Sequence, residues 1–126
     1  MYGYSKQLPL SFHEAVEKTK GELQKEGFGI LTEIDVKTTL KKKLDVDFDK
    51  YIILGACNPP FAHKALENER EIGLLLPCNV IVYEDRGQVS VSTILPTVSM
   101  NMVNNEKLKE IAEEIEEKLK KVIEGL

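Results

Sequence analysis

The chain has 126 residues and a mass of 14.2 kDa, which predicts one domain, residues 1–126, with a hydrophobic core of its own. Hydrophobic residues make up 42% of the chain and charged residues 30%, so the composition excludes a disordered protein. The formal net charge of −4 gives no basic excess to neutralise phosphates, and we expect neither nucleic acid nor an anionic lipid surface as a partner.

The chain begins with signals for a strand and a helix. Residues 2–8 are short and aromatic enough for a first strand, which Pro9 would end. Ser11 and Glu14 then have the S-x-x-E spacing of a capping box, in which each side chain accepts a backbone N–H of the other residue. A helix over residues 12–26 is therefore predicted.

A second strand is predicted over residues 28–35, where apolar and more polar side chains alternate. The spacing then changes to four residues between Val36, Leu40 and Leu44, which indicates a short helix. A strand that continues to Thr39 is the alternative, and the sequence leaves both open.

The central part of the chain predicts a buried strand and a helix. Residues 51–56, YIILGA, form a continuous apolar run, in which Gly55 indicates a bulge or a close backbone approach. Two prolines follow, and a helix is expected to begin with Pro60 in its first turn and to end near Asn68. One face of this helix would consist of Phe61, Ala62, Ala65 and Leu66.

The last third predicts a hairpin and a long helix. Residues 79–84 and 88–95 both alternate in hydrophobicity, and Gly87 lies in the tight turn between them. Asn104 or Asn105 is expected to cap a final helix. Its apolar stripe, which would pack on the sheet or pair across a dimer, consists of Leu108, Ile111, Ile115, Leu119, Val122 and Leu126.

The sequence also predicts a compartment. No segment is long and apolar enough to cross a membrane, and residues 1–12 contain no signal-peptide pattern. We therefore expect a cytoplasmic protein without a membrane partner. Because that compartment keeps cysteines reduced, Cys57 and Cys78 are expected to be thiols and not a disulfide.

Both cysteines lie in one block, residues 55–79, where each precedes an asparagine and lies within two residues of a proline. The candidate binding residues of this block are Cys57, Asn58, His63, Cys78 and Asn79. The two thiols would be close together if the strands before and after them are antiparallel neighbours, and would lie at opposite edges if those strands are parallel. The sequence leaves this arrangement open.

Cys57 and Cys78 are the candidate catalytic residues. Cys57 would end a strand and precede a helix, where free N–H groups and the helix dipole favour a thiolate, with His63 as a base and Asn58 or Asn79 to orient it. The alternative is that Cys57 fills space in the core and that the asparagines shape turns or tie down backbone groups.

Cys57, His63 and Cys78 are also side chains that zinc accepts, with water as a fourth ligand. The chain has no C-x-x-C pair, so the spacing gives this metal site little support. The G-x-G-x-x-G, P-loop, H-E-x-x-H and G-x-S-x-G motifs are absent, so nucleotide-dependent and serine-hydrolase chemistry has no support. The sequence identifies no cofactor.

The segment from Gly55 to Pro59, GACNP, and the segment from Leu75 to Asn79, LLPCN, together resemble the signature block of the domain of unknown function 302 family. Weaker similarity extends over nearly the whole chain. The resemblance implies an α+β fold with the order β-α-β(4)-α, in which helices pack on one face of a curved antiparallel sheet, similar to the TATA-binding-protein-like folds. It also implies a homodimer, but no activity, and fold similarity alone does not imply DNA binding.

These observations favour a cytoplasmic small-ligand-binding module with a pocket between sheet and helix, lined by the candidate binding residues. One alternative is an enzyme or redox protein that uses Cys57 as a thiolate, or a protein that binds metal through Cys57, His63 and Cys78. A further alternative is a structural or interaction domain in which the cysteine block only stabilises the fold. The sequence identifies neither the ligand nor a reaction.

Overall fold

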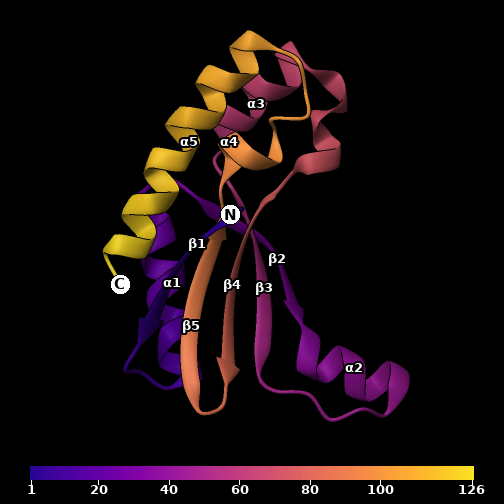
Figure 1. The fold of residues 1–126 in the computed structure, drawn as a ribbon, viewed down its shortest axis with the longest axis vertical. Helices are drawn as coiled ribbons and strands as arrows, with labels where there is room; N and C mark the ends of the chain where they lie inside the picture. Colours follow the sequence, from indigo (N-terminus) through magenta and orange to yellow (C-terminus); the bar gives the residue numbers. More distant parts are fainter.

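An antiparallel sheet forms the centre of the computed structural model, which describes residues 1–126 (Figure 1). Its strands are β1 (Gly3–Leu8), β2 (Gly29–Asp35), β3 (Tyr51–Cys57), β4 (Cys78–Asp85) and β5 (Gln88–Ile94). They lie in the order β1-β5-β4-β3-β2, and every neighbouring pair is antiparallel. All five predicted strands are therefore present.

The predicted hairpin is confirmed by the connection between β4 and β5. Only Arg86 and Gly87 join the two strands, with φ angles of 52° and 79°. Positive φ at both positions matches the right-handed twist of the strands, which is why a two-residue turn of this kind favours glycine.

Helix α1 (Phe12–Lys25) packs on one face of the sheet and begins at the predicted capping box. Ser11 Oγ accepts the N–H of Glu14, and Glu14 Oε1 accepts the N–H of Ser11, both at 3.2 Å. The backbone N–H of Ser11 lowers the pKa of the Glu14 carboxyl, because this hydrogen bond stabilises the charged form.

Helix α5 (Glu106–Glu124) packs on the same face as α1 (Figure 1). Of the two candidate caps, Asn105 is the one that accepts a helix N–H, from Leu108 at 3.2 Å. The apolar stripe of α5 is buried within its own chain, at Leu108, Ile111, Ala112, Ile115, Leu119, Val122 and Ile123. The stripe therefore packs on the sheet, and the alternative in which it pairs across a dimer is wrong.

The four-residue spacing after β2 correctly predicts a helix, α2 (Val36–Leu44). Asp35 accepts the N–H of Thr38 at 3.0 Å and so caps α2, which rules out a strand that continues to Thr39. None of the residues of α2 is buried. In Figure 1, α2 and the loop after it project beyond the sheet as an arm.

Three further elements lie beyond the opposite end of the sheet (Figure 1). Helix α3 (Pro59–Asn68) follows β3 and agrees with the predicted helix. The 3-10 helix η1 (Arg70–Leu75) and the one-turn helix α4 (Pro96–Ser99) were not predicted. Together they extend the α5 side of the molecule past the strands.

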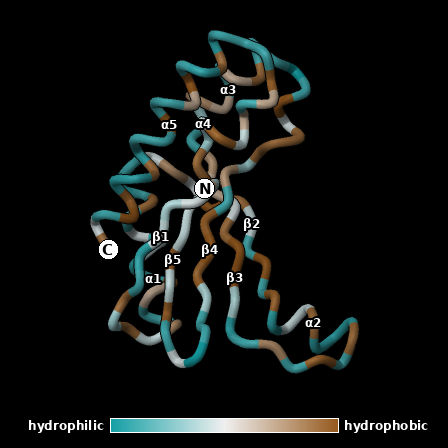
Figure 2. The backbone as a smooth tube through the Cα atoms, in the orientation of Figure 1, coloured by the Kyte–Doolittle hydropathy of each residue, from teal (hydrophilic) through white to brown (hydrophobic).

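Helices α1 and α5 cover one face of the sheet and leave the other face open. Leu54, Val80 and Val82 point toward α1 and α5 and are fully buried. The residues between them on the strands point to the opposite face, which α1 and α5 leave open. Ile34 on this open face is 47% exposed. Figure 2 shows hydrophobic residues along much of β3 and β4, as expected for strands with apolar residues on both faces.

The observed architecture confirms the expected fold class, an α+β fold with a curved five-stranded antiparallel sheet and helices packed on one side. The expected order of elements is interrupted by α2, α3, η1 and α4 between and after the strands. No helix has the length and apolar character needed to cross a membrane.

Candidate functional site

The register of β3 and β4 places the two cysteines at one end of the sheet. Ala56 lies directly opposite Cys78, and Gly55 lies opposite Asn79. The antiparallel alternative is thus the correct one. Residues that face each other across two strands point to the same side, so Cys78 points to the core with Ala56, while Cys57 and Asn79 point to the other side.

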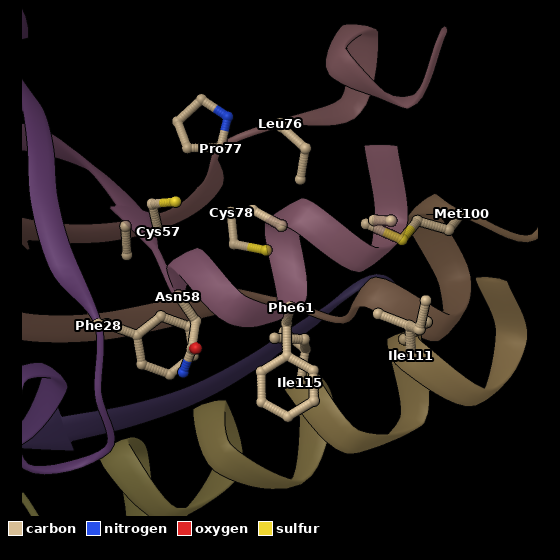
Figure 3. Close-up of a pocket in the computed structure, with 14 residues that line it drawn as sticks. Phe28, Cys57, Asn58, Phe61, Leu76, Pro77, Cys78, Met100, Ile111 and Ile115 are labelled. Atoms are coloured by element: carbon tan, nitrogen blue, oxygen red, sulfur yellow. The ribbon is translucent and has the colours of Figure 1, made fainter. Parts of the chain in front are cut away.

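A small pocket lies beside these strand ends, between the sheet, α3 and α5 (Figure 3). It has a volume of about 40 Å³ and is lined by 14 residues, 12 of them hydrophobic. Six of the lining residues belong to the two cysteine-containing segments, namely Ala56, Cys57, Asn58, Leu76, Pro77 and Cys78. The fold therefore brings the two segments to one cavity.

The rest of the lining comes from other elements of the fold. Phe28 precedes β2, Ala62 belongs to α3, Met100 follows α4 and Ile115 belongs to α5. The sequence indicated that Ala62 and Ile115 lie on apolar helix faces, but it gave no signal for Phe28 or Met100 as pocket residues. Their contribution depends on how the elements pack together.

Asn58 is the residue of the pocket with the most specific polar contact. Its side chain lies at the start of α3 but makes no capping hydrogen bond there. Instead, Nδ2 donates a hydrogen bond to the backbone oxygen of Glu26, at the end of α1, at 3.2 Å. Asn58 is only 8% exposed, so it ties down backbone, as one reading of the sequence proposed.

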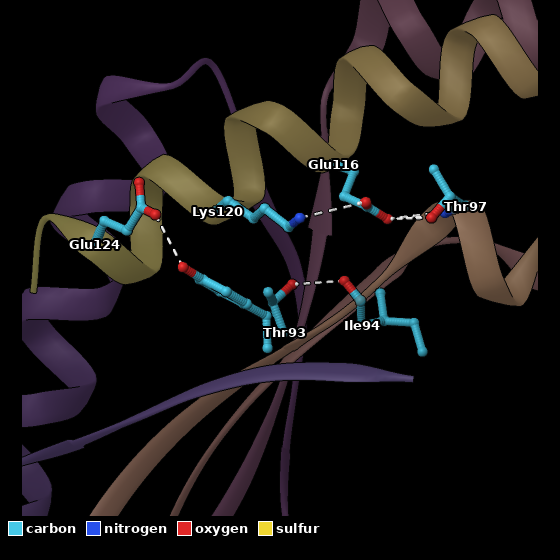
Figure 4. A network of polar contacts seen from close by, with 7 residues as sticks. Thr93, Ile94, Thr97, Glu116, Lys120 and Glu124 are labelled. Atoms are coloured by element: carbon cyan, nitrogen blue, oxygen red, sulfur yellow. Dashed lines mark hydrogen bonds and ion pairs between the residues drawn. The ribbon is translucent and has the colours of Figure 1, made fainter. Parts of the chain in front are cut away.

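Met100 is held in place through the helix that precedes it. The backbone N–H and the hydroxyl of Thr97, in α4, both donate hydrogen bonds to Glu116 Oε1 of α5, at 3.0 Å and 2.7 Å (Figure 4). Lys120 lies 3.7 Å from the other oxygen of the same carboxylate. This network fixes α4 against α5 at the side of the pocket.

The structure does not bring His63 or Asn79 into the pocket. The side chain of His63 is 74% exposed, and its Nε2 lies 3.6 Å from Glu67 Oε1 on the surface of α3. Asn79 is exposed on the open face of the sheet. No group of three His, Cys, Asp or Glu side chains that could hold a metal ion is present, so Cys57, His63 and Cys78 do not form the three-ligand set considered from the sequence.

The two thiols differ in environment. Both are free, but Cys78 is buried whereas Cys57 is partly exposed. Burial, together with a smaller effect of the nearby Cys57, raises the pKa of the Cys78 thiol to about 11, so Cys78 is a neutral thiol at physiological pH.

The helix that follows Cys57 has few free donors at its start. The first two residues of α3, Pro59 and Pro60, have no backbone N–H. Two of the N–H donors that a helix N-terminus normally offers are therefore missing beside Cys57. The geometry gives less support to a thiolate mechanism than the sequence did.

Gly55 has no room for a side chain. A Cβ atom at this position would overlap Thr32 Oγ1 and would lie 2.9 Å from Pro77 Cγ. The close approach predicted from Gly55 is thus confirmed. The absence of a side chain at Gly55 lets Pro77 of the pocket pack against β3 beside Thr32 of β2.

Comparisons with known proteins agree with this architecture. The family model described as "Domain of unknown function DUF302" matches residues 4–126. The crystal structure of an uncharacterized conserved protein DUF302 from Bacillus stearothermophilus has a TM-score of 0.92 and 33% sequence identity, over 98% of this chain and 97% of that chain. No curated protein matches the chain.

Proposed function

The chain belongs to the DUF302 family, whose description assigns no activity, and we propose from the geometry that it is a cytoplasmic, single-domain module that binds a small ligand. The observation that supports this function is that both cysteine-containing segments meet at one apolar cavity. Pockets of this kind, mostly hydrophobic with a few polar groups, are the usual form of small-molecule sites.

The proposed binding residues are Cys57, Asn58 and Cys78, because all three line the cavity, Cys57 from the end of β3 although its side chain points to the other side of the sheet. His63 and Asn79 are not included, since their side chains lie outside it. The volume of about 40 Å³ is far below the several hundred Å³ of a drug-sized site, but it exceeds the space needed for one water molecule. The ligand is therefore a molecule of a few heavy atoms, or the apolar end of a longer one.

Xenon is a suitable first probe, because apolar cavities in proteins bind it. We expect xenon under pressure to shift the backbone amide NMR signals of Asn58, Phe61 and Met100, all of which line the pocket. Ala62→Leu should abolish these shifts by filling the cavity. His63→Leu places the same side chain on the exposed side of α3 and should leave them unchanged.

Two results would contradict the proposed site. One is an absence of xenon shifts at the pocket amides of the unmodified protein. The other is the same set of shifts in the protein and in Ala62→Leu, which would place the xenon elsewhere.

We also propose that the module is a homodimer whose interface is the open face of the sheet and the α2 arm. Apolar side chains remain exposed there, including Ile34 at 47%, Leu44 at 67% and Phe48 at 44%. Because α2 buries none of its residues within its own chain, a partner surface would stabilise it. Apolar patches on both the sheet face and the arm match the surface of a protein–protein contact.

A second copy of the chain is the partner that the charges of the arm favour. A two-fold contact must be self-complementary, because the same patch meets itself. The arm meets this condition with lysines and aspartates close together, at Lys41, Lys42, Lys43, Asp45, Asp47 and Asp49.

Native mass spectrometry should give twice the chain mass of 14.2 kDa. Ile34→Asp, on the open face, should shift the protein to the monomer. Leu74→Asp introduces the same charge at a position that is 82% exposed in η1, and it should leave the dimer intact. A monomeric parent protein, or dissociation by Leu74→Asp but not by Ile34→Asp, would show that this face is not the interface.

The proposed location in the cytoplasm has one structural feature in its support. Cys57 and Cys78 are both free thiols, the state that a reducing compartment maintains.

A further inference from the structure

One side chain in the pocket differs from all the others. Among the 14 lining residues, Asn58 is the one whose side chain contains oxygen or nitrogen, and none of the 14 carries a charge. The remaining polar atoms of side chains are the sulfurs of Met100 and the two cysteines. An uncompensated charge on a ligand would therefore find no partner in this cavity.

The amide nitrogen of Asn58 makes a hydrogen bond within the protein, whereas its amide oxygen makes none. Nδ2 donates to the backbone oxygen of Glu26 at 3.2 Å, which fixes the plane and the direction of the amide. Oδ1 accepts no hydrogen bond from the protein and keeps some accessible surface, because no fully buried side-chain oxygen or nitrogen lacks a partner, while Asn58 as a whole is only 8% exposed. Oδ1 is therefore an acceptor that the contact of Nδ2 with Glu26 holds in place, and Asn58 itself lies among the pocket residues (Figure 3).

The turn after α1 keeps Asn58 in this position. Gly27 has a φ angle of +84°, and a Cβ atom there would lie 3.2 Å from Asn58 Nδ2. Glycine thus permits both the left-handed backbone and the approach of the amide to Glu26. Gly27 is a positioning residue for Asn58, since it does not line the pocket itself.

We infer that the ligand of this pocket is a small neutral molecule with an apolar body and one O–H or N–H group, which donates a hydrogen bond to Asn58 Oδ1. The inference rests on the proposed function and adds the chemical class of the ligand. Carboxylates, phosphates and ammonium ions are excluded from the cavity, because nothing in its lining compensates their charge.

The test compares two probes with the same heavy-atom skeleton. Isopropanol has a hydroxyl donor, whereas acetone has only a carbonyl acceptor, so the two differ in the group that Asn58 recognises. Both are titrated against the protein, and binding is followed by the amide NMR signals of the pocket residues. We expect isopropanol to bind about 2 to 10 times more tightly than acetone, the size expected for one neutral hydrogen bond.

Asn58→Leu replaces the amide with an apolar side chain of similar size and should make the two affinities equal. A second pair of variants keeps the test decisive if Asn58→Leu does not fold. Gly27→Ala should reduce the preference for isopropanol, because the added methyl group displaces the Asn58 amide. Gly87→Ala has the same backbone cost at a φ of +79° but meets nothing within 4 Å, so it should keep the preference.

The outcomes separate this inference from the proposed function. If xenon binds in the pocket but isopropanol and acetone bind equally, the ligand class is wrong and the site remains. A preference for isopropanol that persists in Asn58→Leu, or that Gly27→Ala and Gly87→Ala change equally, also overturns the role of Asn58. If neither xenon nor either solvent binds at the pocket, the proposed function itself fails.

Discussion

Asn58 Nδ2 and the backbone oxygen of Glu26 form a hydrogen bond of 3.2 Å between residues 32 positions apart in the chain. The bond joins the residue before α3 to the residue that follows α1, so one buried amide links the start of one helix to the end of the other. Because a buried amide without a partner is costly, this contact also stabilises the pocket in the absence of any ligand.

The parent protein should lose stability as the pH rises above about 9, and Cys78→Ala should abolish this loss. Burial, together with a smaller effect of the neighbouring Cys57, raises the pKa of the Cys78 thiol from its usual 9.0 to about 11 in the folded chain. The folded state holds the proton more tightly than the unfolded state. The resulting stabilisation is therefore fully present below pH 9 and is lost as the pH rises to about 11. A shift of this size corresponds to about 2–3 kcal/mol.

Urea unfolding across this pH range measures the effect. The free energy of unfolding of the parent protein should fall more steeply than that of Cys78→Ala. Cys57→Ala is the matched control and should keep the steep fall, because Cys78 is still present. Parallel pH profiles for the parent protein and Cys78→Ala would show that Cys78 does not contribute.

Gly55→Ala should destabilise the fold by about 1–3 kcal/mol, the usual cost of forcing an added group into space that other atoms occupy. The new Cβ would overlap Thr32 Oγ1 and press on Pro77, on adjoining strands and at the pocket. Gly73→Ala is the control, because a Cβ there meets nothing within 4 Å and should change stability by less than about 0.5 kcal/mol.

Thr32→Ala tests the cause of the Gly55→Ala effect. It removes the oxygen that the new methyl group would meet, so the double variant should lose less stability than the sum of the two single variants. Thermal or urea unfolding of the four proteins gives the coupling energy. Strict additivity would mean that the overlap with Thr32 is not the source of the destabilisation.

The elements with local signals were predictable from the sequence. The capping box at Ser11 and Glu14 depends on residues three positions apart, and the turn at Gly87 depends on backbone conformation at one site. Of the four residues predicted from spacing to form one face of α3, Phe61, Ala62 and Ala65 line the pocket, whereas Leu66 does not and is 37% exposed. The same spacing places His63 off that face, so its exclusion from the site follows from the same periodicity.

The rest of the site depends on tertiary structure that no local pattern records. Met100 enters the pocket because Glu116 holds α4, and Glu116 lies 19 residues beyond Thr97. Asn58 meets Glu26 only after the end of α1 and the start of α3 have come together in the folded chain. The direction of β3 relative to β4 decided whether the cysteines share an edge, and the sequence allowed both arrangements.

Asn105→Ala should cost about 1–2 kcal/mol of stability, since Asn105 caps α5 and its Nδ2 also donates to the backbone oxygen of Asn68 at 3.0 Å. The second contact ties the start of α5 to the end of α3. Asn104→Ala is the matched control, because Asn104 is exposed and does not cap the helix, and it should have almost no effect. Urea unfolding of the two variants distinguishes them. Equal losses would mean that the cap contributes nothing measurable.

Glu116→Ala should loosen α4 and change the environment of Met100, so it tests the network in Figure 4 as a support of the pocket. The substitution removes the carboxylate that accepts both hydrogen bonds of Thr97, at 3.0 Å and 2.7 Å. Hydrogen bonds to charged groups contribute more than neutral ones, and a loss of about 1–3 kcal/mol is expected. The methyl NMR signal of Met100 reports the local change, and urea unfolding reports the stability.

Glu117→Ala removes the same side chain one position along α5, where the glutamate is exposed and makes no contact with Thr97. It should leave both the Met100 signal and the stability near those of the parent protein. If Glu116→Ala lowers stability but leaves the Met100 signal unchanged, the network stabilises α5 without shaping the pocket. If the two variants behave alike, the contact between α4 and α5 depends on apolar packing, because the Thr97 hydrogen bonds would then add nothing to it.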